Sequence, residues 1–346
     1  MKRILLIGAG HAHLAVLRSL REEPLHGARF ALATARAKQI YSGMLPGVIA
    51  GHYRRHEAEI DVARLAEAAY AEFIEGEVVK LDPAQKLVKL ADGAELEFDF
   101  VSINAGSLVE RTLPGAHFAL PVKPYEPFYD RLRTAKLNRV AIAGAGVSGA
   151  EIAMALRYRG AAVTLYSEKP ALWPPRAEPV LRRLGVDLRP AMPVDEIERG
   201  PVVISGTTTQ EFDLVVLATA AVGQKWLRAS GLPCDEQGFL LVDDMLRSVA
   251  HPEVFAAGDC ATLRSGPLPR SGVYALRQGE TLAASFRRVV QGEPPLEHRA
   301  QRVALVLMSC GRRYAVAQRG NWSAQGHWVW WWKNHIDRRW VKSLTV

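Results

Sequence analysis

Cysteine is scarce in this 346-residue chain, which contains only Cys234, Cys260 and Cys310. Three widely separated cysteines cannot build a disulfide scaffold, and this favours a reducing compartment, the cytoplasm. No apolar run approaches the roughly 18 residues that suggest a membrane span. We also expect no secretory signal, because an apolar strand pattern begins at the first residues. These absences exclude a disulfide-rich secreted domain and a protein anchored by a membrane-spanning helix.

Acidic residues are nearly missing from the C-terminal segment. Between Arg299 and Val346 there are nine Lys or Arg residues and one acid, Asp337, so this segment accounts for the whole net charge of +8. It also holds six of the eight tryptophans. Indole rings and cations together suit the surface of an anionic membrane, and we expect peripheral contact with the inner face of the cell membrane.

Two other interpretations of this segment remain open. Trp328, Trp330 and Trp332 alternate as one face of a strand would, which favours a packing role over membrane contact. Aromatic and basic residues can also bind nucleic acid. The packing interpretation is the stronger of these two, and we expect no nucleic-acid partner.

The chain contains two copies of a strand, a glycine turn and a helix-forming segment. The first copy has Gly8-Ala-Gly10 after the strand-like residues 2–7, and the second has Gly144-x-Gly146-x-x-Gly149 after residues 139–143. Such turns expose backbone amides at a helix N-terminus and predict two pyrophosphate sites. In the first copy His13 replaces the third glycine, so we expect a helix tilted outward or a ring pointing into a gap.

The strands beside the two turns differ at the position that usually contacts a ribose. Thr34 stands where the first unit would carry an acid, which weakens a plain NAD assignment there. In the second unit Glu168 lies one place beyond the usual acid, next to Lys169, and this favours NADH over NADPH. Residues 98–107 and 212–220 are strands that close on small residues, repeating the architecture.

These patterns predict an α/β protein with two Rossmann-like dinucleotide-binding domains, the second inserted in the first. We place the first domain at 1–112 and 246–298, the second at 113–245 and a small β-rich basic segment at 299–346. The loop 41–47 is either a surface connection or part of a ligand site. We expect a hairpin about Asp92-Gly93, a helix from about Gln278 to Gly292, strands at 302–309, 312–317 and 327–332, and a short helix at 333–344.

The motifs resemble those of the pyridine nucleotide-disulfide oxidoreductase superfamily, in the branch around type II NADH dehydrogenases. The motifs that carry this resemblance are Gly8-Ala-Gly10, Ala105-Gly106-Ser107, Gly144 to Glu151 and Ala257-Gly258-Asp259. Within that branch, Gly8 to Leu14, Tyr41 to Gly47, Val122-Lys-Pro, Arg312-Arg-Tyr-Ala and Lys333-x-x-Ile-Asp-Arg-Arg are similar to the flavoprotein domain that some organisms fuse to selenide, water dikinase.

The resemblance implies FAD in the first turn and NAD(P)H in the second. The residues implied for FAD are Gly8, Gly10, His11, Ala12, Met44, Leu45, Val78, Ala105, Gly106, Gly258, Asp259 and Ala275, with Asp259 on the ribitol. Those implied for NADH are Lys123, Gly144, Gly146, Ser148, Gly149, Glu151, Glu168 and Thr219. Tyr274 and Gln278 are implied for the side of the electron acceptor.

A redox disulfide is excluded, because no cysteine precedes Cys234 and a dithiol relay needs two neighbouring sulfurs. We therefore expect direct hydride transfer from NADH to the flavin, then electron transfer to a quinone or similar acceptor, with no side chain as catalyst. The alternative is a flavin-binding, selenium-linked redox partner with little NADH turnover. We expect no metal, because His11 and His13 lack a third ligand. The sequence does not decide between a monomer and a homodimer.

Overall fold

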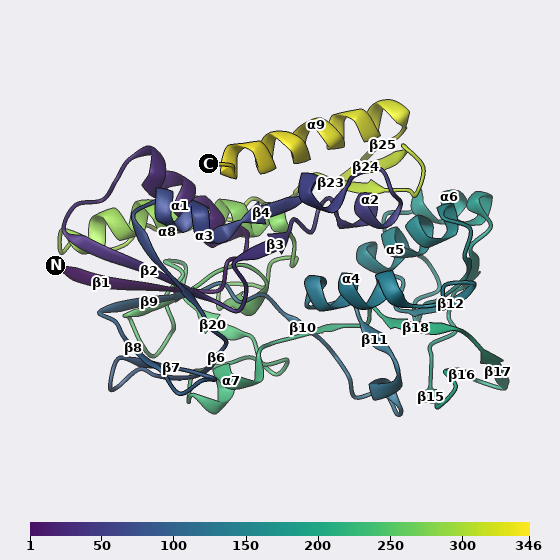
Figure 1. Ribbon diagram of the computed structural model, residues 1–346, viewed down its shortest axis with the longest axis horizontal. Coiled ribbons are helices and arrows are strands. Elements are labelled where there is room, and N and C mark those ends of the chain that lie inside the picture. The colour runs from purple at the N-terminus through teal and green to yellow at the C-terminus, as the bar shows by residue number, and fades with distance from the viewer.

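The computed structural model describes residues 1–346 and contains two parallel sheets with helices packed on them (Figure 1). The first sheet has the strand order β21-β9-β1-β2-β5, and all of its pairs are parallel. The central strand is β1, and its buried residues, 4 to 7, are all apolar. Apolar side chains of the neighbouring strands are buried beside them. The bounds are β1 Lys2–Ile7, β2 Ala28–Thr34, β5 Ala71–Glu75, β9 Phe100–Ile103 and β21 Val254–Ala256.

Three helices accompany this sheet: α1 His11–Glu22, α3 Val62–Ala68 and α8 Gly272–Val290. Helix α1 packs closely on α8 because Gly279 has no side chain, and a Cβ there would come within 2.3 Å of the Ala12 carbonyl oxygen. Asp61 caps α3 by accepting a hydrogen bond from the Arg64 amide. The long helix α8 confirms the helix expected up to Gly292 and begins six residues earlier than Gln278.

The second sheet has the order β11-β18-β12-β13-β14 and is also parallel. Its strands all lie in sequence between β9 and β21 of the first sheet, so the second unit is inserted in the first, as predicted. The strands are β11 Leu120–Pro121, β12 Arg139–Ala143, β13 Ala162–Tyr166, β14 Asp187–Arg189 and β18 Leu214–Leu217; the helices are α4 Tyr125–Thr134, α5 Val147–Tyr158 and α6 Ala177–Leu184.

Smaller elements complete the two units. The hairpin expected about Asp92-Gly93 is confirmed as β7 and β8, with Gly93 at a φ of +94°. The remaining strands before the C-terminal segment are β3 Lys38–Ile40, β4 Glu59–Asp61, β6 Val78–Asp82, β7 Leu87–Leu90, β8 Glu95–Glu97, β10 Leu108–Val109, β15 Glu196–Glu198, β16 Val202–Ser205, β17 Thr208–Glu211, β19 Ala221–Val222, β20 Leu240–Val242 and β22 Ala261–Leu263. The short helices are α2 Leu45–Ile49, α7 Lys225–Ala229 and 3₁₀ turns at Arg55–Glu57, Ala116–Phe118 and Gly258–Cys260.

The C-terminal segment forms an antiparallel sheet and one long helix. The strands are β23 Val306–Ser309, β24 Ala315–Arg319 and β25 Trp322–Gly326, and α9 runs from His327 to Leu344. In Figure 1 this yellow helix lies along the upper edge, with its end near α1. No helix of the structure is both long enough and apolar enough to cross a membrane.

The strand predicted at 327–332 is wrong, because those residues form the first part of α9. Tryptophans at every second position matched a strand, although Trp328 and Trp332 also have the four-residue spacing of a helix. Trp328 and Trp332 stack on one another four residues apart, and both are exposed, whereas Trp330 is buried. The packing role predicted for all three therefore holds for Trp330 alone.

Candidate functional site

The first glycine turn joins β1 to α1 at the carboxyl edge of the first sheet. Gly8 has a φ of +81°, and a Cβ there would lie 2.7 Å from the Asn104 carbonyl oxygen, so only glycine fits. The Gly8 amide donates to Ala33 O at 2.8 Å. The predicted residues Gly8, Gly10, His11 and Ala12 are thus contiguous at one helix N-terminus. The amides of Gly10 and Ala12 also have acceptors, both on Asn104, so the His11 amide is the one left for a pyrophosphate.

His13 stands where the motif usually has its third glycine, and its ring fills a gap between helix α1 and the sheet. Its ring is buried, with Nδ1 2.6 Å from Gly8 O and Nε2 2.8 Å from Ser102 Oγ. Burial lowers the pKa of His13 to about 4, so the ring is neutral at physiological pH. Of the two outcomes expected from the sequence, the ring in a gap is the one observed.

The second glycine turn joins β12 to α5 and keeps all three glycines. Gly144 has a φ of +108°, and a Cβ on Gly149 would come within 2.0 Å of Gly144 O. Gly146 is exposed, with open space where its side chain would stand. The amides of Val147, Ser148 and Gly149 have no protein acceptor, which leaves them for an anion. Thr219 lies two residues after β18, where its hydroxyl donates to Glu110 O.

A cluster of charged side chains lies where the two units meet. Lys123, between β11 and α4, donates from Nζ to Asp259 Oδ2 at 2.7 Å and to Ser107 Oγ at 2.8 Å. Ser107 follows Ala105 and Gly106 in the loop after β9. Lys123, expected beside NADH, therefore contacts the carboxylate that the sequence placed on the flavin ribitol.

Aromatic and acidic groups of the second unit face the same cluster. Burial raises the pKa of Tyr125, Lys123 opposes this rise, and the carboxylates of Asp259 and Glu151 add to it. Glu151, on α5, accepts a hydrogen bond from the Ser309 amide at 2.7 Å. Burial raises the pKa of Glu151 to about 7, while Lys333 and that hydrogen bond act in the opposite direction.

The acceptor-side residues Tyr274 and Gln278 lie on α8 together with Ala275, and all three are buried. Gln278 Oε1 accepts the Gly258 amide at 2.6 Å, so it supports the turn that presents Asp259. A small pocket is lined by this turn, by the start of α8 and by the preceding loop, including Arg270. The Arg270 guanidinium lies 3.4 Å from the centre of the Phe239 ring.

The loop predicted as either a connection or a ligand site is buried at Met44 and Leu45, which begin α2. Helix α9 fixes this loop. Lys333 Nζ donates to Gly43 O and to Asp337 Oδ2, both at 2.6 Å, and Tyr41 donates to Asp337 Oδ1 at 3.4 Å.

Three residues with structural roles near the site were not predicted from the sequence, and two predicted residues lie outside the Lys123–Asp259 cluster. Lys333 and Asp337 were missed as a pair, although an i,i+4 spacing of opposite charges within a tryptophan-rich helix is a usable signal. Asn104 was missed because it stood among small residues. Glu168 is exposed after β13, and Val78 is buried at the start of β6; neither is hydrogen-bonded to Lys123.

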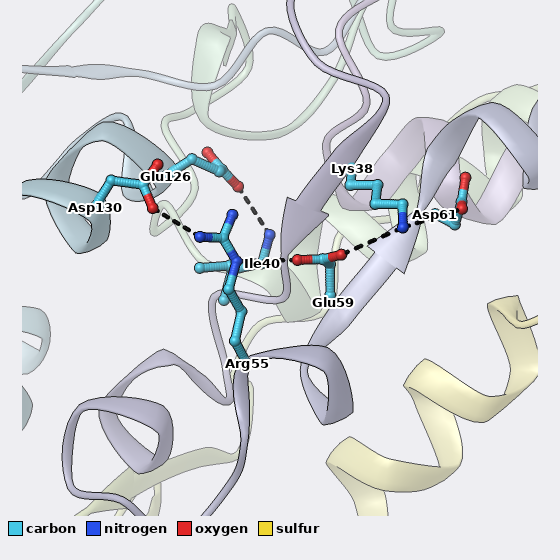
Figure 2. A network of polar contacts seen from close by, with 7 residues as sticks. All are labelled: Lys38, Ile40, Arg55, Glu59, Asp61, Glu126 and Asp130. Carbon is cyan, nitrogen blue, oxygen red and sulfur yellow. Dashed lines mark hydrogen bonds and ion pairs between the residues drawn. The ribbon is translucent and has the colours of Figure 1, made fainter. Parts of the chain in front are cut away.

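A second polar network attaches the first unit to α4 (Figure 2). The Ile40 amide donates to Glu126 Oε1 at 2.8 Å, and Arg55 contacts Asp130 at 2.7 Å and Glu59 at 3.0 Å. Because α4 begins just after Lys123, these contacts help fix the position of that lysine. The network therefore holds α4 of the second unit against the loop and strands of the first unit.

The three cysteines are free, and Cys260 and Cys310 are buried. Burial raises the pKa of each of these two thiols to about 12, so neither forms a thiolate at physiological pH. No group of three or more His, Cys, Asp or Glu side chains is arranged to hold a metal ion.

Two glycine turns lie at the carboxyl edges of two parallel sheets, and the second unit is inserted in the sequence of the first, which defines a protein with two dinucleotide-binding units. The family profile of the pyridine nucleotide-disulphide oxidoreductases matches residues 2–283. The chain belongs to this family, whose cofactors are FAD and NAD(P)H, and it is an NAD(P)H-dependent flavin oxidoreductase. The resemblance to the domain fused to selenide, water dikinase stays a prediction.

Two curated relatives are similar to the chain over most of its length. The chain is 29% identical to the nitric oxide reductase FlRd-NAD(+) reductase of Aeromonas salmonicida, over 78% of this chain and 73% of that protein. It is 26% identical to ferroptosis suppressor protein 1 of Xenopus tropicalis, over 91% and 88%.

Solved structures share the fold. The sulfide:quinone oxidoreductase of Aquifex aeolicus superposes with a TM-score of 0.83 at 16% identity, covering 99% of this chain and 91% of the other. NDH2 from Plasmodium falciparum, in complex with NADH, superposes with a TM-score of 0.79 at 12% identity, covering 99% and 98%.

Proposed function

We propose that the protein oxidises NADH with FAD in the first glycine turn and delivers the electrons to a quinone at a membrane surface. The observation that carries this proposal is the meeting of both units at Lys123, which belongs to the second unit yet bonds Asp259 of the first. A dinucleotide on each turn would extend toward this junction. When bound, FAD supplies hydride acceptance and electron transfer.

The chain's own residues bind and orient the two dinucleotides. The amides of Val147, Ser148 and Gly149, with open space at Gly146, suit the NADH pyrophosphate. Glu168 would accept hydrogen bonds from ribose hydroxyls and repel a 2′-phosphate, which favours NADH over NADPH. Asp259, a half-buried carboxylate held by Lys123, suits the ribitol hydroxyls of FAD.

No thiol takes part in this proposal. Cys260 follows Asp259 directly, yet it is buried and its sulfur donates to backbone carbonyls. The chain therefore offers no disulfide to relay electrons, and a bound flavin would supply the electron transfer to the acceptor. Gln278 would shape the acceptor side by supporting the Gly258–Asp259 turn, and Tyr274 lines the pocket beside it.

The outer face of α9 supports a lipid-soluble acceptor. Trp328 and Trp331 are 56% and 58% exposed, and Trp332 and Ile336 follow on the same helix at 38% and 40%. The exposed residues on the rest of the helix, after Ile336, are basic: Arg338, Arg339 and Lys342. Exposed indoles followed by cations match the interface of an anionic bilayer, where a quinone is dissolved. The proposed location is the cytoplasmic face of the cell membrane.

The acceptor can be tested with protein that NADH has reduced in the absence of oxygen. Reoxidation should be fast with a quinone in anionic vesicles and slow with ferredoxin. Gln278→Glu keeps an oxygen for the Gly258 amide but adds charge, so it should slow reoxidation by quinone more than reduction by NADH. Faster reoxidation by ferredoxin would contradict the quinone assignment.

A further inference from the structure

Asn104 is a buried polar residue that joins three segments of the first unit. It follows β9 and is 3% exposed. Its side-chain oxygen accepts the amides of Ala12 at 3.0 Å and His13 at 3.2 Å, while Nδ2 donates to Ala257 O at 2.6 Å. One side chain thus connects the first turn of α1 to the segment that presents Gly258 and Asp259.

These contacts make Asn104 an N-cap supplied from another strand. The residue at the N-cap of α1 is Gly10, which has no side chain to bond the free amides of the first turn. Two glycines leave the space that Asn104 fills. A Cβ on Gly10 would lie 2.4 Å from Asn104 Oδ1, and a Cβ on Gly258 would lie 2.5 Å from Nδ2.

The second unit lacks this device. Asn104 and Ala218 occupy equivalent places, because their amides donate to the last residues of the central strands, Ile7 and Ala143, both at 2.8 Å. Ala218 has no polar side chain, and the first amides of α5 stay without a protein acceptor. His13 adds contacts to Gly8 O and Ser102 Oγ in the first unit, whereas the equivalent residue of the second unit is Gly149, which has no side chain.

We propose that Asn104 is a positioning residue that holds the first glycine turn in its FAD-binding shape. This inference rests on the proposed placement of FAD. Asn104 occupies the amides of Ala12 and His13 from the sheet side, which leaves the His11 amide for the pyrophosphate and fixes α1 relative to Asp259. The first turn is therefore held by a side chain of its own unit, whereas the second turn keeps its first helix amides without a protein acceptor.

The test compares FAD loss from the purified holoprotein, followed by flavin fluorescence after dilution, in the wild type and Asn104→Ala. Loss of one cap is expected to weaken FAD binding about tenfold and to leave the NADH concentration for half-maximal flavin reduction unchanged. Hydrogen exchange of the peptide covering residues 11–17 should rise in the variant. A general loss of stability would instead weaken both dinucleotides.

Asn104→Asp is a second variant of the same size, useful if the alanine variant does not fold. It keeps the acceptor for both amides but loses the donor to Ala257 O, and it should also release FAD faster. FAD retention equal to or tighter than in the wild type, in either variant, would overturn the inference, since Asn104 would then fill space or compete with the pyrophosphate. Wild-type protein that cannot bind FAD would contradict the proposed function itself.

Discussion

Lys123 reaches from the second unit to Asp259 of the first, with 2.7 Å between ammonium nitrogen and carboxylate oxygen. Both side chains are about one-fifth exposed, at 20% and 21%, so the pair is partly protected from solvent. A second side-chain contact joins the same edge, because Gln224 Nε2 donates to Ala105 O at 3.1 Å. This ion pair places the only cation bonded to Asp259 in the segment that leads into α4.

Replacing Lys123 should therefore destabilise the protein. Lys123→Met removes a charged hydrogen-bond donor and leaves Asp259 with less solvation, which should lower the free energy of unfolding by roughly 1–3 kcal/mol. Urea unfolding of the wild type and the variant measures the difference. Lys123→Arg, which keeps the charge, serves as the control and should recover part of the loss; equal stability of Lys123→Met and the wild type would contradict the prediction.

Two glycines of the second turn, Gly146 and Gly149, should respond differently to alanine. Gly149→Ala places a Cβ within 2.0 Å of Gly144 O, so the turn must deform and the melting temperature should fall. Gly146→Ala meets open space and should leave the melting temperature near that of the wild type. It should still raise the NADH concentration needed for flavin reduction, because the dinucleotide approaches this backbone. Thermal melts and NADH titrations separate the two effects, and similar melting temperatures for the two variants would count against the structure of this turn.

The pKa of Glu151 predicts a pH dependence of stability. Burial raises this pKa from 4.5 to about 7, so between these values the folded state binds the proton more strongly than the unfolded state. The resulting stabilisation is complete below about pH 4.5 and is lost as the pH rises through about 7. Glu151→Gln should therefore lose less stability than the wild type between about pH 5 and pH 8. Melting temperatures at both pH values test this, with the exposed Glu168→Gln as control; a steeper loss in Glu151→Gln would refute the assignment.

Helix α9 should bind anionic vesicles through two separable contributions. Replacing Arg339 or Lys342 by alanine should weaken the free energy of binding to anionic vesicles by about 1 kcal/mol each. Added salt should reduce this difference. Trp331→Ala should weaken binding at every salt concentration, because its contribution is apolar. Vesicle sedimentation measures both, with Lys89→Ala, on the distant strand β7, as the control. Binding that neither salt nor these variants change would make the exposed tryptophans a contact for another partner.

Much of the fold could be predicted from the sequence, because the evidence for it is local. The glycine turns, the strands before them and the repeated strand ends each occupy a few consecutive residues, and the structure contains them where the pattern placed them. The helix at 327–332 was missed because a tryptophan at every second position matches a strand, while the pairing of Trp328 with Trp332 is visible only at helical spacing.

The contacts between distant segments could not be predicted in the same way. Asn104 lies 92 residues from Ala12 and 153 from Ala257, so no local pattern signals its role. Lys123 was expected beside NADH from a resemblance between short motifs, and its bond to Asp259 depends on how the two units dock. The ribose preference of the second turn, by contrast, still depends on the sequence argument at Glu168.

The central claim is that NADH reduces a flavin held by this chain. Purified protein should be yellow, and one equivalent of NADH added in the absence of oxygen should bleach the flavin absorption band. Gly146→Glu, which places a negative charge where the pyrophosphate amides are free, should keep the colour and lose the bleaching. Yellow wild-type protein that neither NADH nor NADPH bleaches would contradict the account and favour a flavin-binding partner without turnover.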